Sequence, residues 1–79
     1  MPRLIRVSAT ELIKFLEKQG FAIDRQKGSH IVLTRQLKIS KQVLTVPNHK
    51  ELDIGTTKAI YNQCKKYIDE ETLDIFFYK

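Results

Sequence analysis

Residues 21–47 contain three short strand-forming segments in succession, with no helical pattern between them. The segments are FAIDRQ (21–26), HIVLTR (30–35) and KQVLTVP (41–47), and each carries β-branched or aromatic residues. Only the turn around Gly28 and the polar loop QLKIS separate them, and connections this short join antiparallel strands. The sequence therefore predicts a three-stranded antiparallel meander, which needs a second layer to cover one of its faces.

An amphipathic helix precedes the strands. Ser8 and Glu11 have the S-x-x-E spacing of a capping box, in which each side chain accepts a hydrogen bond from an unpaired backbone amide. Gly20 marks the end of this helix. Its apolar face, which predicts contact with the sheet, contains Leu12, Ile13, Phe15 and Leu16.

Two more helices are expected after the strands. The second begins near Gly55 or Thr56, and the third follows an Asp69 cap. The apolar stripe of the second helix contains Ile60, Cys64 and Tyr67. We therefore expect residues 1–79 to form one domain of the α+β class, a two-layer sandwich in the order α-β-β-β-α(-α), with the helices on one face of the sheet.

The other face of the sheet is expected to remain uncovered. Side chains alternate between the two faces of a strand, so if Ile31 and Leu33 face the helices, His30 faces away from them. The same alternation places four more residues on the uncovered face, namely Val32, Thr34, Val43 and Thr45.

The net charge of +5 is unevenly distributed. Residues 1–50 carry ten Lys and Arg against three Asp and Glu, whereas residues 51–79 carry four against six. The segment 25–50 holds no acidic residue and six basic ones, which are Arg25, Lys27, Arg35, Lys38, Lys41 and Lys50. This distribution favours a polyanionic partner such as RNA.

Composition excludes several other classes. No apolar run approaches the ~20 residues that span a bilayer, and the N-terminal segment lacks the apolar stretch of a secretory signal, so we expect a cytoplasmic protein with no membrane partner. The lone Cys64 predicts a small core residue, since one cysteine forms neither an internal disulfide nor a zinc site. Two histidines without a third ligand predict no metal site, and no cofactor is expected.

The histidines suit metal-independent cleavage of RNA. That reaction needs a base for the 2′-hydroxyl proton, cations to offset the charge on the transition state, and an acid for the leaving oxygen. Histidine serves as base or acid because an unperturbed imidazole titrates near pH 6.5. His30 is the expected base and His49 a possible acid, with Lys27 or Lys41 as phosphate clamp. Further candidate RNA contacts are Arg25, Gly28, Ser29 and Lys50.

The residues alone leave two other functions open. A non-catalytic RNA-binding module would hold A-form RNA by contacts to phosphates and 2′-hydroxyls and would need the basic residues but not His30. A protein-interaction domain that meets an acidic partner through its basic surface would not need the histidine either. Only a nuclease should arrest growth in a manner that His30→Ala abolishes.

Four segments of the chain resemble the HicA (YcfA-like) mRNA interferase toxins in order and spacing. They are ATELIKFLEKQGF, RQKGSHIVL, LTVPNHKEL and IGTTKAIYNQ, and the G-S-H and V-P-x-H motifs make the resemblance specific. It implies a double-stranded-RNA-binding-domain-like fold, ribosome-independent cleavage of mRNA, and neutralisation by a HicB-type antitoxin. The family's catalytic histidine corresponds to His30, and the histidine of V-P-x-H to His49. The chain departs from the family pattern at Thr57 and in the segment QCKKY.

Overall fold

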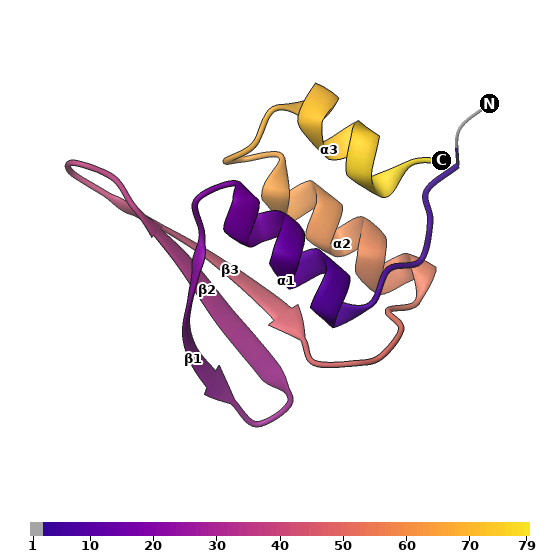
Figure 1. The fold of residues 1–79 in the computed structure, drawn as a ribbon, viewed down its shortest axis with the longest axis horizontal. Helices are drawn as coiled ribbons and strands as arrows, with labels where there is room; N and C mark the ends of the chain where they lie inside the picture. The colour runs from indigo at the N-terminus through magenta and orange to yellow at the C-terminus, as the bar shows by residue number, and fades with distance from the viewer. Residues whose placement is uncertain (1–2) are drawn as a thin grey trace.

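The computed structural model describes residues 3–79, which form three helices and one three-stranded antiparallel sheet (Figure 1). The elements are α1 (Ala9–Lys18), β1 (Ala22–Lys27), β2 (His30–Gln36), β3 (Lys41–Pro47), α2 (Ile54–Cys64) and α3 (Glu70–Phe77). The predicted α+β class and the order of the elements are confirmed.

Local hydrogen bonds fix where α1 begins and ends. The Ser8 hydroxyl accepts from the Glu11 amide at 3.1 Å, and the Glu11 carboxylate accepts from the Ser8 amide at 3.2 Å, so the predicted capping box is present. Gly20, with φ +97°, follows the last turn in the left-handed conformation that glycine adopts most readily. Leu12 and Leu16 are fully buried beneath the helix.

Aspartate caps start the other two helices. The Asp53 carboxylate accepts from the Thr56 amide at 2.7 Å, and the Asp69 carboxylate accepts from the Thr72 amide at 3.0 Å. These hydrogen bonds hold the pKa of both carboxyl groups below its ordinary value. The predicted Asp69 cap is confirmed, whereas α2 begins at Ile54, slightly earlier than the sequence indicated, because Asp53 caps it.

The sheet has the order β1-β2-β3, with α1 and α2 on one face, where both contact β3. Figure 1 shows α3 farther from the sheet, above the other two helices in this view. Aromatic side chains join α3 to them, since Phe76 stacks on Phe15 at 4.3 Å between ring centroids and Phe77 meets the edge of Tyr61 at 5.4 Å. The helix layer therefore has an inner part that covers the sheet and an outer part that covers the inner one.

The core lies between the sheet and these helices. From the sheet it takes Ile31 and Leu33 of β2 and Leu44 and Val46 of β3. Cys64 is fully buried there, as predicted, and burial raises the pKa of its thiol to about 12. Within residues 3–79, no helix is both long enough and apolar enough to cross a membrane.

The edge strand β1 is less buried than its sequence indicated. Phe21, immediately before the strand, is buried, but Ile23 remains 51% exposed. Ile23 pairs with Leu33 and so shares the helix-covered side of the sheet. The helices approach the sheet most closely at β3, on the other edge, so they leave this part of β1 uncovered.

Candidate nucleic-acid interface

A two-residue turn places His30 at the first position of β2. Gly28 and Ser29 connect β1 to β2. Gly28 has a φ of +60°, whereas the φ of Ser29 is not positive, because within residues 3–79 only glycines have a positive φ. A positive φ at the first central position alone defines a type II′ turn, which needs glycine there. Lys27 and His30 therefore face each other as the first pair of the hairpin, and both are exposed.

Gly28 also leaves the backbone of this turn accessible. A Cβ atom built at Gly28 would meet no atom within 4 Å. The glycine is therefore required by the backbone conformation and not by crowding from other parts of the chain. The main chain at this point is therefore open to close approach by another molecule.

A bulge in β1 determines which side of the sheet its basic residues face. Ile23 pairs with Leu33 on the helix-covered side, but the next pair joins Arg25 to Val32 on the other side. Asp24 is thus an extra residue in β1, and its carboxylate accepts a hydrogen bond from Nη1 of Arg25 at 2.7 Å. The basic residues after the bulge consequently face away from the helices.

We call the side away from the helices the open face. Residues directly opposite each other on neighbouring strands share a side, so the pairings define its rows. In order from the turn, the rows are Lys27, His30 and Pro47; Arg25, Val32 and Thr45; Ala22, Thr34 and Val43; and Gln36 with Lys41. The expected side of the sheet is confirmed for His30, Val32, Thr34, Val43 and Thr45, but Val32 is buried and not uncovered as expected.

The loop after β3 brings His49 to the same end of the sheet as His30. The Asn48 amide donates to the Ser29 carbonyl at 2.6 Å, which joins this loop to the turn before His30. The His49 carbonyl accepts from the Ala9 amide at 3.0 Å, at the start of α1. The contact between Asn48 and Ser29 could not be predicted from the sequence, because it joins two backbone groups and does not depend on the side chain of residue 48. Both histidine side chains are exposed.

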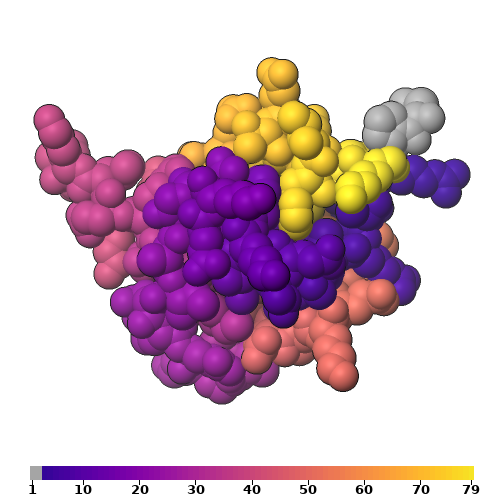
Figure 2. Space-filling model, in the orientation of Figure 1, coloured from indigo at the N-terminus to yellow at the C-terminus, as the bar shows by residue number. Residues whose placement is uncertain are grey.

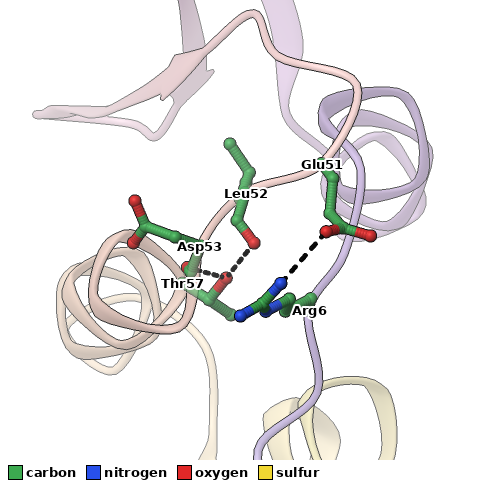
Figure 3. A network of polar contacts seen from close by, with 5 residues as sticks. All are labelled: Arg6, Glu51, Leu52, Asp53 and Thr57. Atoms are coloured by element: carbon green, nitrogen blue, oxygen red, sulfur yellow. Dashed lines mark hydrogen bonds and ion pairs between the residues drawn. The ribbon is translucent and has the colours of Figure 1, made fainter.

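A polar network holds the rest of this loop in place (Figure 3). The Thr57 side chain is fully buried, and its hydroxyl lies 2.8 Å from the Asp53 carbonyl and 3.5 Å from the Leu52 carbonyl. Arg6 and Glu51 form an ion pair of 3.3 Å on the surface, where such pairs contribute little to stability. The Thr57 hydroxyl therefore fixes the start of α2, whereas the Leu52 amide, which donates to the Val7 carbonyl at 2.8 Å, ties the end of this loop to the segment before α1.

The candidate lysines lie at different distances from His30. Lys50 follows His49 directly and is exposed. Lys41 pairs with Gln36 at the opposite end of the sheet, six residues along β2 from His30, which is about 20 Å in an extended strand. Lys41 therefore cannot contact the phosphate beside His30, and Lys27 is the lysine placed for that contact.

One of the six basic residues of segment 25–50 points toward the helices and adds no charge to the open face. Arg35 turns to the helix side, where its guanidinium lies 4.7 Å from the centroid of the Phe21 ring. It donates to the carbonyls of Gln19 and Tyr67 and to the side chain of Gln42, each at 2.7 Å. Arg35 is therefore not available to a polyanionic partner, because these contacts occupy its guanidinium internally.

The chemical groups at this end of the sheet suit proton transfer and phosphate binding. No group of three or more His, Cys, Asp or Glu side chains in residues 3–79 is arranged to hold a metal ion. The four phenylalanines and three tyrosines all lie in the core or pack against it, so none reaches the open face. What the open face offers is exposed imidazole, cations and threonine hydroxyls.

A separate hollow of about 690 Å³ lies on the helix layer. Its lining consists of Tyr61, Glu70, Glu71, Asp74, Ile75 and Tyr78. The Tyr61 hydroxyl donates to Asp74 at 2.5 Å, which raises the pKa of the tyrosine. Three carboxylates in the lining repel a polyanion, so the open face and not this hollow is the candidate RNA site.

Comparison with known proteins agrees with these features. The family model described as "HicA toxin of bacterial toxin-antitoxin" matches residues 9–66, from the first residue of α1 to beyond the end of α2, and the matched range includes both histidines. No curated protein and no solved structure matches the chain. Because the matched range covers well over half of the sequence, the chain belongs to the HicA toxin family of bacterial toxin–antitoxin systems.

Proposed function

We propose that this toxin is an endoribonuclease that cleaves mRNA without the ribosome and without a metal ion, and that His30 is its catalytic base. The observation that carries the proposal is the position of His30, which is exposed on the open face, directly opposite Lys27 and one row from Arg25. A base beside cations is the combination that cleavage through the 2′-hydroxyl requires.

In the proposed reaction, His30 removes the proton of the 2′-hydroxyl and the 2′-oxygen attacks the adjacent phosphorus. The bond from phosphorus to the 5′-oxygen breaks, and the leaving oxygen takes a proton from an acid. His49 is the candidate acid because its loop is joined to the turn before His30. The products are a 2′,3′-cyclic phosphate and a 5′-hydroxyl, and the Lys27 ammonium offsets charge on the phosphate oxygens.

The open face favours contacts to the sugar–phosphate backbone of RNA. RNA-binding sheets that read single-stranded bases stack them on aromatic side chains. Every phenylalanine and tyrosine of this chain belongs to the helix side and the chain has no tryptophan, so the open face has no platform of such rings. Phosphates would instead meet Arg25, Lys27 and Lys50, and 2′-hydroxyls would meet Ser29 and the backbone at Gly28.

An antitoxin is the partner of a toxin in this family, and we propose that it is of the HicB type and silences the toxin by covering the open face. The basic half of the chain would attract an acidic antitoxin to the same surface that attracts RNA. Such an antitoxin would bury His30 and contact Lys27 or Lys41, and RNA could not bind at the same time.

The reaction is tested with a synthetic RNA that the purified toxin cuts once and with the same RNA carrying a 2′-deoxyribose at the cut nucleotide. We expect cleavage of the first in the presence of EDTA and no cleavage of the second, because the attacking oxygen is missing. Cutting of the deoxy substrate, or loss of all cutting in EDTA, would contradict the mechanism. Binding of both RNAs without any cleavage would instead support a non-catalytic RNA-binding module.

A further inference from the structure

We infer that the β2–β3 hairpin is a second RNA contact site, which binds the same strand about 20 Å from the phosphate at His30. The inference rests on the proposed function, because it extends the RNA path along the open face. It gives the toxin a preference for single strands long enough to reach from one end of the sheet to the other.

The hairpin projects away from the rest of the molecule. Residues 37–40 connect the two strands, and Figure 2 shows this part of the chain extending at the left, clear of the helices. Ile39 at its tip is 98% exposed and Leu37 is 42% exposed. Ile39 therefore buries almost nothing within the chain and Leu37 buries only part of its surface, so apolar surface at this tip is available to a partner.

Two lysines accompany this apolar tip. Lys38 lies in the connection, and Lys41 begins β3 in the last row of the open face. Both are exposed, and the ion pairs formed within residues 3–79 involve neither of them. Their charge is therefore uncompensated, and it lies at the far end of the same face that carries His30.

The rows between His30 and Lys41 are compatible with a bound strand. Apart from Arg25, these rows contain no charged side chain. Their centre is formed by Val32, Thr34, Val43 and Thr45. The two threonines provide hydroxyl groups that can bond with phosphates or 2′-hydroxyls. The Asp24 carboxylate lies 2.7 Å from the Arg25 guanidinium, where the ion pair offsets its charge, and none of the residues in these rows is acidic.

The distance sets the length of RNA that the face can hold. A stacked strand advances about 3.4 Å per nucleotide, so about 20 Å corresponds to about six nucleotides. The phosphate at His30 and the phosphate at Lys41 would then belong to one strand, with the intervening nucleotides above the threonines. Leu37 and Ile39 would meet sugars or base edges beyond the last row.

RNA is favoured over a protein as the occupant of the hairpin because of where the charge lies. Lys41 shares its face with Lys27, Arg25 and His30, and a single polyanionic chain can contact all of them in sequence. A protein that recognised only the apolar tip would have no need of a basic row on this face.

The test measures binding separately from cleavage. Fluorescence anisotropy records the affinity of the His30→Ala protein for labelled oligoadenylates of about four to about sixteen nucleotides, the range of site sizes common in single-strand-binding folds. We expect affinity to rise steeply with length up to about six nucleotides. Longer oligonucleotides should bind only slightly more tightly, because they offer more equivalent positions for the same contacts. Oligoadenylate keeps its bases stacked, so the advance of about 3.4 Å per nucleotide applies to this probe.

The hairpin is then altered in the same background. The double variant Lys38→Gln/Lys41→Gln should lose affinity for the long oligonucleotides several-fold and leave the shortest ones unaffected. Lys18→Gln is the matched control, because it removes an exposed charge from α1, away from the open face. Thermal unfolding monitored by circular dichroism confirms that each variant is folded.

Three results would overturn the inference. The first is an equal loss of affinity for short and long oligonucleotides in the double variant, and the second is the same loss in Lys18→Gln. The third is that the double variant has the same dependence of affinity on RNA length as its parent but no longer binds the antitoxin, which would assign the hairpin to a protein partner. RNA cleavage by the wild-type protein is measured in parallel, because it tests the proposed function by itself. If the wild-type protein cleaves RNA but the length dependence is absent, the second contact site is wrong and the proposed function stands.

Discussion

Single residues of the same type have opposite roles in this chain, as Arg25 and Arg35 illustrate. Arg25 is exposed on the open face, and its only partner within residues 3–79 is its neighbour Asp24. Arg35, ten positions later, ties the end of α1 to the turn after α2 through the carbonyls of Gln19 and Tyr67. The first guanidinium is available to a ligand, and the second stabilises the fold.

We predict that Arg35→Met destabilises the protein by about 2–4 kcal/mol, because the change removes charge-assisted hydrogen bonds and leaves two backbone carbonyls without their donor. Methionine keeps most of the apolar stem that packs on Phe21. The free energy of unfolding is measured with urea.

The matched comparison is Arg25→Met, which should change that free energy by no more than about 0.5 kcal/mol because its side chain is exposed. Equal losses in the two variants would mean that net charge, and not the internal contacts of Arg35, is responsible for the destabilisation.

At the scale of secondary-structure elements, features fixed by neighbouring residues could be predicted. The Ser8 and Asp69 caps and the bounds of β3 depend on residues close in sequence, and the structure has them as expected. The alternation within β2 likewise placed His30 on the open face.

Features that depend on distant residues could not be predicted in the same way. The bulge at Asp24 depends on the register between β1 and β2, and alternation along β1 gives no sign of it. The exposure of Ile23 depends on which strand the helices cover, and the inward turn of Arg35 depends on carbonyls from two other elements. The distance of Lys41 from His30 depends on their lying at opposite ends of paired strands.

The open face also predicts how RNA binding responds to salt. If three of its cations contact phosphates, the logarithm of the binding constant should fall with the logarithm of salt concentration with a slope of about −2, from ~0.7 per phosphate on a single strand. The His30→Ala protein is titrated with single-stranded RNA at several salt concentrations. Lys27→Gln should make the slope shallower by about 0.7, whereas Lys18→Gln should leave it unchanged. A flat response in the parent protein would favour a protein-interaction domain.

Over the whole molecule, charge is divided between two sides. The basic residues of the open face lie on the sheet, whereas Glu70, Glu71 and Asp74 gather around the hollow on the helix layer. A polyanion is therefore attracted to one side of the molecule and repelled by the other, which orients its approach. RNA and an acidic antitoxin would be directed to the same surface.

We predict that RNA and antitoxin exclude each other. When the cognate antitoxin is added to the His30→Ala protein carrying labelled RNA, the RNA should be released, and inhibition of the active toxin should follow the same concentration curve. A stable ternary complex in which RNA remains bound while cleavage stops would show that the antitoxin distorts the site without covering it.

The most direct test of the central claim compares RNA cleavage by the wild-type, His30→Ala and His49→Ala proteins, with thermal unfolding of each. His30→Ala should cut RNA at least ~10²-fold more slowly, the usual contribution of a proton-transfer group, and should unfold at nearly the same temperature because the side chain is exposed. His49→Ala should also slow cleavage if His49 is the acid, and its folding should be unchanged. A folded His30→Ala protein that cuts RNA at the wild-type rate would contradict the account, as would a His30→Ala protein that no longer folds.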